Sequence, residues 1–304
     1  MGTPEAAVPT LQCLIEDGHE VVAVWTQPDR PSGRGNKVSV SPVKQLALAH
    51  GLVVHQPAKI KSSESTGLFA SHNADVAIVV AYGRILPLEM LRAPKRGCIN
   101  LHFSLLPLYR GAAPVNWALI NGEVKTGVTT MFIEEELDSG PILLQRETRI
   151  DQSETSSELT SHLAKIGAEV LAETLDQLDE ITPRPQHDFD ATFAPMLRKE
   201  DGLINWSNNA LAIERCVRGF QPWPNAYTSY QSRRLIIWSA AVTAAEDAGT
   251  AVGEVLHCHG DDLIVRCGDR TALRLIEVQP EAKRRMSVRD FLNGARLKIG
   301  DRFE

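Results

Sequence analysis

The sequence predicts an α/β protein with two domains, a doubly wound and mostly parallel sheet followed by a smaller β-barrel. The length of 304 residues leaves room for two hydrophobic cores. In the first part of the chain, short apolar segments alternate with helical segments, which is the pattern of parallel strands joined by crossover helices. After residue 226, five short strand-like segments follow one another, and this spacing is typical of a small barrel.

We expect the first elements to be a helix, a strand and a long loop. Thr3 and Pro4 have the residue types of a helix N-terminus, and Gly18 is expected to end that helix. Residues 21–26 predict a short buried strand. Residues 27–43 hold three prolines and two glycines, so we expect a long loop there. Loops of this length inside compact domains are usually functional or mobile.

The rest of the first domain predicts further strands and a long helix. After a short helix, strands are expected at residues 52–55, 75–82, 98–102, 126–133 and 142–150. Thr155 and Glu158 form a capping box, and apolar residues recur every three or four positions as far as Leu178, which indicates an amphipathic helix. Residues 181–202 show little periodicity and predict a linker between domains at 1–180 and 203–304. The barrel strands are expected at 227–230, 235–238, 253–257, 263–267 and 273–278.

Two polar side chains occupy alternate positions of the strand at 98–102. Asn100 and His102 are two residues apart, so in an extended strand they project from the same face. The carboxyl end of a buried strand is where open α/β sheets hold their chemistry. The amide can donate to an oxygen that gains negative charge, and the imidazole can take a proton, so the pair suits attack of an amine on a carbonyl. Taken alone, the pair also fits a turn-capping asparagine and a buried structural histidine.

Asp138 lies in the segment L-D-S-G, between two strands that follow the strand of His102. A carboxylate brought close to the imidazole could fix its tautomer, raise its basicity or hold a water that relays a proton. Because Ser139 and Gly140 are natural turn residues, an ordinary exposed loop aspartate is the alternative.

Composition and charge argue against several classes of protein. The five cysteines are odd in number and form no Cys-x-x-Cys pair, which argues against a disulfide framework and a structural zinc site. No apolar run approaches the roughly 18 residues of a membrane span and no signal segment is seen, so we expect a cytoplasmic protein. The net charge is −6, yet residues 203–304 carry 14 Lys and Arg against 12 Asp and Glu and could bind a polyanion locally.

Several longer segments carry a resemblance to a known family. They read N-L-H-F-S-L-L-P-L-Y-R-G-A-A-P from Asn100, then N-G-E-V-K-T-G-V-T-T-M and L-D-S-G, with T-Q-P-D-R-P-S-G-R-G before them and F-Q-P-W-P and Q-P-E-A-K-R-R-M-S after them. Over essentially the whole chain, these segments resemble the folate-dependent formyltransferases. The arginine-bearing loop and F-Q-P-W-P resemble the branch whose acceptor is the methionyl group of initiator tRNA.

The resemblance implies a Rossmann-like catalytic domain at 1–180, a linker, and an OB-like C-terminal domain at 203–304 that binds tRNA. It implies 10-formyltetrahydrofolate as co-substrate and formyl donor, with no metal. The acceptor would be the α-amine of methionyl initiator tRNA, in translation initiation. We expect a monomer without a membrane partner.

Site residues follow from the matched motifs. Asn100 would polarise the formyl oxygen, His102 would handle the proton, and Asp138 would orient and tune His102. The residues expected to border the folate are Ser104, Leu105, Leu106 and Pro107. The residues expected to contact tRNA are Arg34, Lys37, Lys283, Arg284 and Arg285.

The sequence departs from the family pattern at several positions. The chain begins at Met1-Gly2-Thr3, whereas the family has an apolar strand just before this motif. The first strand is therefore expected to be missing, and we expect the natural start to lie upstream or the chain to be truncated. Phe103 replaces a small residue, and strand alternation turns it away from the polar pair. Asn36 and Met196 stand where the family often has basic residues, which puts those tRNA contacts in doubt. Ala282 replaces a usual glycine, which matters only if that backbone needs a positive φ.

Other functions remain open at this stage. A sugar-nucleotide or glycinamide-ribonucleotide formyltransferase, or a formyl-folate hydrolase, would use the same three residues. A tRNA-binding protein with an inactive formyltransferase domain belongs to a different class, and the presence of Asn100, His102 and Asp138 argues against it.

Overall fold

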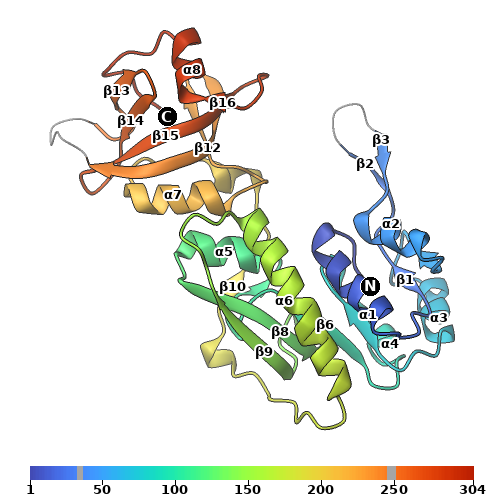
Figure 1. Cartoon of the computed structure of the whole chain (residues 1–304). Helices are drawn as coiled ribbons and strands as arrows, with labels where there is room; N and C mark the ends of the chain where they lie inside the picture. Colours follow the sequence, from blue (N-terminus) through green and yellow to red (C-terminus); the bar gives the residue numbers. More distant parts are fainter. Residues whose placement is uncertain (33–36, 245–250) are drawn as a thin grey trace. The chain divides into compact units, whose positions relative to one another are not determined.

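The computed structural model describes residues 1–32, 37–244 and 251–304 (Figure 1). It divides into two compact units, each with its own core. Unit 1 comprises Met1–Pro114, Lys125–Arg149 and Thr160–Pro195, and unit 2 comprises Val115–Val124, Ile150–Leu159 and Met196–Glu304. The stretch 181–202, which we expected to be a linker, contributes 181–195 to unit 1 and the remainder to unit 2.

The sheet of unit 1 is parallel in its first half and antiparallel at one edge. Its strands are β1 (Val24–Trp25), β4 (Val54–His55), β5 (Ala77–Val79), β6 (Cys98–His102), β8 (Lys125–Phe132) and β9 (Ile142–Arg149). The β1–β4 and β5–β6 pairs are parallel, whereas β8 is antiparallel to both β6 and β9. This arrangement confirms the Rossmann-like fold class, with the extra strands at one edge.

Met1 and Gly2 lie in the same sheet, between β1 and β5. The Gly2 amide donates to the Trp25 carbonyl (3.0 Å), and the Val80 amide donates to the Met1 carbonyl (2.9 Å). Met1 and Gly2 line a cavity of about 730 Å³, whose other lining residues include 19–25 and 72–78. The short segment therefore joins the two parallel pairs into one sheet.

Helices cover both faces of this sheet. In unit 1 they are α1 (Val8–Glu16), α2 (Pro42–Ala49), α3 (Ser63–Ser71), α4 (Leu88–Leu91) and α6 (Ser156–Asp176) from Thr160 onward, whereas most of α5 (Pro114–Asn121) belongs to unit 2. On one face Ile99 packs with Leu171 of α6, and on the other Cys98 packs with Met90 of α4. Because alternate residues of a strand face opposite sides, Asn100 and His102 project from the Cys98 face, away from α6.

Two expectations for the N-terminal part were wrong. Residues 27–43 contain a hairpin, β2 (Arg30–Ser32) paired with β3 (Lys37–Ser39), in place of a plain loop. Lys44 holds its base through an ion pair with Asp29 (2.5 Å) and a hydrogen bond to Gln56 (2.6 Å). Thr3 does not cap the first helix, because a 3-10 turn (Glu5–Ala7) opens it and the Thr3 hydroxyl accepts from the Gln27 amide.

Unit 2 is built on an antiparallel sheet. Its elements are α7 (Ala210–Gly219), β11 (Tyr227–Tyr230), β12 (Arg233–Ala244), β13 (Val255–His259), β14 (Asp262–Arg266), β15 (Thr271–Pro280), β16 (Met286–Ser287) and α8 (Val288–Gly294). The strand order is β11-β12-β15-β14-β13. The last residues of the chain bridge the two edge strands, because Val255 donates to the Asp301 carbonyl and Ser229 donates to the Glu304 carbonyl (both 2.8 Å). These bonds close the sheet in the way a barrel requires.

Ala282 lies in the turn between β15 and β16 with a φ of 59°, so this backbone does need the conformation that favours glycine. We predict that Ala282→Gly raises the free energy of unfolding by up to about 1 kcal/mol, because it removes a steric penalty that exceeds the added chain entropy. Urea unfolding measures the change. Ala251→Gly, at an exposed position without a positive φ, is the control and should lower stability. Equal losses in both variants would contradict the argument.

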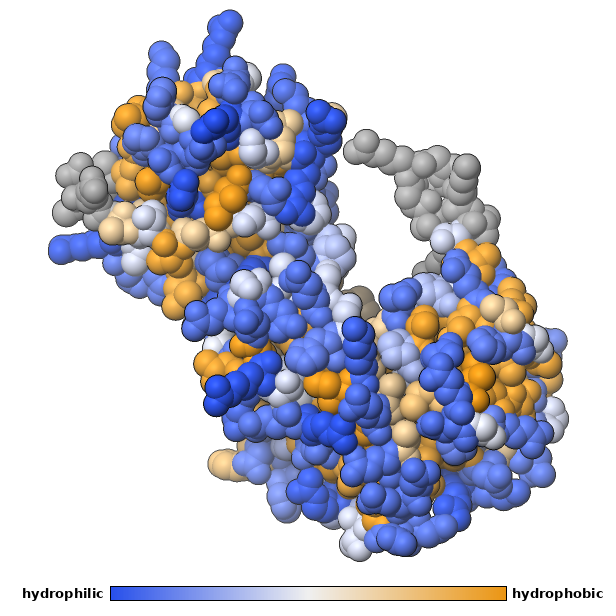
Figure 2. Space-filling model, in the orientation of Figure 1, coloured by the Kyte–Doolittle hydropathy of each residue, from blue (hydrophilic) through white to orange (hydrophobic). Residues whose placement is uncertain are grey.

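The surface is mainly hydrophilic on the face shown in Figure 2, where hydrophobic residues form smaller patches. Large exposed apolar side chains such as Phe189, Trp223 and Ile299 are spread along the chain. Among the described residues, no helix combines the length and the apolar character needed to span a membrane.

Candidate active site

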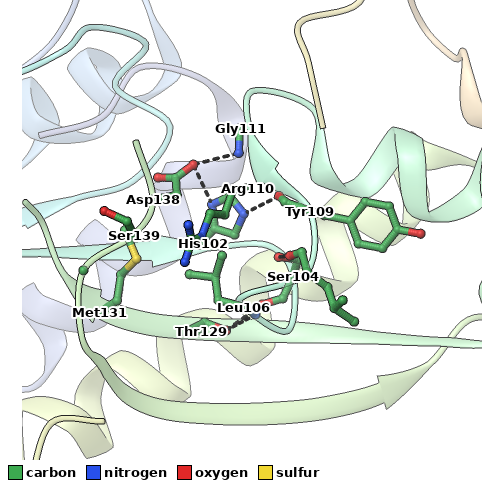
Figure 3. Close-up of polar contacts among 12 residues, drawn as sticks. His102, Ser104, Leu106, Tyr109, Arg110, Gly111, Thr129, Met131, Asp138 and Ser139 are labelled. Carbon is green, nitrogen blue, oxygen red and sulfur yellow. Dashed lines mark hydrogen bonds and ion pairs between the residues drawn. The ribbon is translucent and has the colours of Figure 1, made fainter. Parts of the chain in front are cut away.

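The end of β6 brings His102 to a buried position with both ring nitrogens facing polar groups. The side chain is only 6% exposed. Its Nε2 lies 2.9 Å from the carbonyl oxygen of Tyr109 (Figure 3). Because a carbonyl oxygen only accepts hydrogen bonds, Nε2 must carry the hydrogen. In the neutral ring, Nδ1 is therefore the nitrogen that can take a proton.

Asp138 lies on the Nδ1 side of the ring. Its Oδ2 is 3.7 Å from Nδ1 and accepts a hydrogen bond from the Gly111 amide at 2.9 Å (Figure 3). The distance of 3.7 Å exceeds that of a direct hydrogen bond, so the carboxylate acts on the ring through its charge or through an intervening water. The side chain is 14% exposed, which limits screening of that charge.

Asn100 lies on β6 two residues before His102, at the preceding position of the same face. In the sheet register it stands between Val79 of β5 and Met131 of β8, and it is half-buried. Its side chain shares the face of His102 by strand alternation. The structure therefore brings His102 and Asp138 together and places Asn100 on the same face of the same strand.

Three residues other than glycine near this strand end have left-handed backbone conformations. Ala81 after β5 has a φ of 46°, Tyr109 a φ of 62° and Asp138 a φ of 53°. For residues other than glycine, such conformations are costly, and they cluster at functional sites because the surrounding structure must hold them in place. Two of the three supply the groups that face His102, namely the Tyr109 carbonyl and the Asp138 carboxylate.

The turn that follows β6 is fixed against the antiparallel edge of the sheet. The Ser104 hydroxyl donates to the Leu108 carbonyl (2.6 Å), and the Leu106 amide donates to the Thr129 hydroxyl (3.1 Å). Gln145 of β9 donates to the Leu106 carbonyl (2.8 Å). Ser104 and Leu106 are buried, whereas Leu105 and Pro107 are partly exposed. The turn therefore has a fixed shape beside the histidine, and folate contact by these four residues stays a prediction.

The residues expected to contact tRNA lie in both units. Arg34 lies outside the described residues, and Lys37 lies on β3, opposite Ser32 in the register. Lys283, Arg284 and Arg285 are all exposed in the turn between β15 and β16, and Arg285 also forms an ion pair with Glu277 and lies over the Trp238 ring at 5.0 Å. Of these last three, Arg285 already has partners in the fold.

Several residues of the site were not identified from the sequence. Tyr109 contributes a backbone carbonyl, and Gly111 contributes a backbone amide. Arg110 is 5% exposed and bonds to Gln186 and Asp188, which lie in the stretch expected to be a linker. For Tyr109, Arg110 and Gly111, the only signal in the sequence was the Y-R-G segment of the matched motif. Among the described residues, no group of three or more His, Cys, Asp or Glu side chains is arranged to hold a metal ion.

Comparison with known proteins gives two family matches. Residues 1–175 match the family described as "Formyl transferase", and residues 196–296 match "Formyl transferase, C-terminal domain". Curated relatives are similar over nearly the whole chain. The methionyl-tRNA formyltransferase of Caldanaerobacter subterraneus subsp. tengcongensis is 48% identical, across 99% of this chain and 97% of its own. That of Citrifermentans bemidjiense is 49% identical, across 99% of this chain and 94% of its own.

Solved structures with low sequence identity share the fold. WlaRD, a sugar 3N-formyl transferase crystallised in the presence of dTDP and 5-N-formyl-THF, aligns with a TM-score of 0.66 at 18% identity, covering 93% of this chain and 97% of its own. HypX from Aquifex aeolicus, in complex with tetrahydrofolic acid, aligns with a TM-score of 0.59 at 18% identity, covering 81% of this chain and 43% of its own.

Proposed function

The chain belongs to the family of methionyl-tRNA formyltransferases, and from this premise we propose that Asn100, His102 and Asp138 are the residues that carry out formyl transfer. Membership makes the chain an enzyme that formylates methionyl initiator tRNA with a folate-derived formyl donor. The observation that supports the residue assignment is the His102 ring, held between the Tyr109 carbonyl and the Asp138 carboxylate.

The reaction joins the methionyl α-amine to the formyl carbon. The neutral amine attacks, a C–N bond forms, and the formyl oxygen becomes an oxyanion in a tetrahedral intermediate. The Asn100 amide donates to that oxygen, which stabilises the charge that develops there. The excess proton of the amine passes to His102 Nδ1, directly or through a water. The intermediate then collapses, the bond to the folate nitrogen breaks, and that nitrogen leaves with a proton.

The hydrogen bond at Nε2 determines which ring nitrogen takes up the proton. Since Nε2 donates to Tyr109, proton uptake at Nδ1 produces an imidazolium with both N–H groups facing oxygen atoms. The Asp138 carboxylate faces the N–H that this proton transfer creates. The same imidazolium can return its proton to the departing folate nitrogen, so one residue serves both halves of the reaction.

The donor that we propose is 10-formyltetrahydrofolate, bordered by Ser104, Leu105, Leu106 and Pro107. This turn follows the histidine directly and is fixed by Thr129 and Gln145, so a ligand there would meet a preformed surface. The tetrahydrofolic acid in HypX supports a folate ligand for this fold. No step of the proposed reaction needs a metal.

For the acceptor, we propose that tRNA phosphates contact Lys283 and Arg284, together with Arg34 and Lys37. Lys283 and Arg284 are exposed. Lys and Arg side chains that neutralise phosphates release counterions, so binding should weaken steeply as salt rises. Arg285 is a weaker candidate because Glu277 already neutralises it. We propose that the enzyme acts as a monomer in the cytoplasm, with unit 1 catalytic and the C-terminal part of unit 2 binding tRNA.

The direct test is a formylation assay with purified methionyl initiator tRNA and 10-formyltetrahydrofolate, run beside a 3-amino sugar nucleotide as acceptor. We expect the formyl group to be transferred to the methionyl-tRNA and not to the sugar nucleotide. Transfer to the sugar nucleotide alone would identify a sugar formyltransferase. Retention of the tRNA on a filter without turnover would identify a binding protein with an inactive catalytic domain.

A further inference from the structure

One side chain of an exposed segment points into unit 1. In the stretch 182–190, every residue is exposed except Gln186, which is half-buried. The backbone is held at both ends of this stretch. Arg184 and Ile142 exchange two hydrogen bonds of 2.8 Å, and Phe193–Ala194 forms β10, parallel to β7 (Arg110–Gly111). The segment therefore crosses this part of unit 1 in one defined path.

The amide of Gln186 is fully engaged by groups of the site. Its Nε2 donates to the carbonyl oxygens of Asp138 (2.9 Å) and Gly140 (2.8 Å). Its Oε1 accepts from Arg110 Nε at 3.0 Å. A guanidinium only donates and carbonyl oxygens only accept, so the orientation of this amide is fixed by its partners.

Arg110 holds Gln186 in turn. Its guanidinium is 5% exposed and forms an ion pair with Asp188 at 2.8 Å, two residues beyond Gln186. Arg110 and Gly111 are neighbours in the two-residue strand β7. The Gly111 amide donates to the Asp138 carboxylate, and the Arg110 side chain donates to Gln186, so one short strand contacts both groups.

The two carbonyls that Gln186 binds flank Ser139, so this amide fixes the turn that carries Asp138. Asp138 has a φ of 53°, a conformation that its neighbours must maintain. If the turn relaxed, the carboxylate would lose its place beside Gly111 and His102. A displacement of about 1 Å of a reacting or supporting group can cost roughly 100-fold in rate.

We propose that Gln186 is a positioning residue for the formyl transfer reaction, which acts by clamping the Asp138 and Gly140 carbonyls and so holding the Asp138 carboxylate beside His102. The inference rests on the proposed role of Asp138. It gives the segment that we expected to be a linker a part in holding the Asp138 carboxylate in place.

Two substitutions at Gln186 distinguish a residue that holds the turn of Asp138 from one that only binds Arg110. Gln186→Leu removes every hydrogen bond at similar volume. Gln186→Glu keeps an acceptor for Arg110, but its carboxylate cannot donate to the carbonyls of Asp138 and Gly140. We expect both to lower kcat roughly 10- to 100-fold, with KM for tRNA and folate within about twofold of the wild type. Wild-type kcat in Gln186→Glu would overturn the proposal.

The control is His187→Ala, an exposed neighbour on the same segment, which should keep the wild-type kcat. Circular dichroism and thermal unfolding establish that each variant is folded. If Gln186→Leu does not fold, Gln186→Asn replaces it, because this variant keeps the amide but is too short to reach both carbonyls and Arg110.

A double-mutant cycle with Asp138→Asn decides whether Gln186 acts through Asp138. Residues that act as a unit show non-additive effects, so Gln186→Leu should cost little more once Asp138 has been changed. Additive losses would overturn the proposal. Wild-type turnover in Asp138→Asn alone would instead refute the proposed function of the site. A loss in Asp138→Asn with none in Gln186→Leu would refute only the present inference.

Discussion

His102→Ala should abolish nearly all turnover while leaving the protein folded. The variant removes the group that we propose takes the proton of the attacking amine, and general acid–base catalysis contributes about 10²- to 10⁴-fold. The substrates bind mainly elsewhere, so KM for methionyl-tRNA should change little. Single-turnover formylation with saturating folate and tRNA measures the chemical step directly.

His102→Gln sharpens this test. A glutamine amide can still donate to the Tyr109 carbonyl in place of Nε2, but it cannot take up a proton. If proton transfer is the role of His102, this variant should be as slow as His102→Ala. If the ring served only to fill its buried site and satisfy Tyr109, His102→Gln would retain most of the activity. Wild-type turnover in either variant would show the residue assignment to be wrong.

The core of the site could be predicted because its signals are local. Alternation along one strand places Asn100 and His102 on one face, and Cys98–His102 does form a strand, β6. The packing of Cys98 and Ile99 on opposite faces supports it. Asp138 needed the family motif, since nothing in a loop sequence gives its distance from a strand. The structure brings its carboxylate to 3.7 Å from the ring.

The groups that hold the site could not be predicted, because they depend on tertiary contacts. Gln186 and Asp138 are 48 residues apart, and the stretch around Gln186 has neither helical nor strand periodicity. The Tyr109 carbonyl and the Gly111 amide belong to the backbone and carry no side-chain signal. The hairpin of β2 and β3 was likewise interpreted as a loop, since prolines and glycines are expected in both.

Asn100→Ala should lower kcat about 10²- to 10³-fold, equivalent to about 2.7–4 kcal/mol of transition-state stabilisation. The amide is needed most when the formyl oxygen carries a full charge, so the loss should appear in kcat more than in either KM. Asn100 is half-buried in the middle of β6, and truncation of this polar side chain should cost the fold little compared with this effect. Formylation kinetics with both substrates varied measure the two parameters.

The choice of substituent distinguishes an oxyanion donor from a space-filling residue. Asn100→Leu keeps the volume without the donor, and Asn100→Asp keeps the shape but opposes the oxyanion with a negative charge. We expect the Asp variant to be slower than the Leu variant, because repulsion in a partly buried site adds to the missing hydrogen bond. Equal or reversed rates would mean that no negative charge develops beside this residue. In that case, the oxygen of the intermediate must be stabilised by a group other than Asn100.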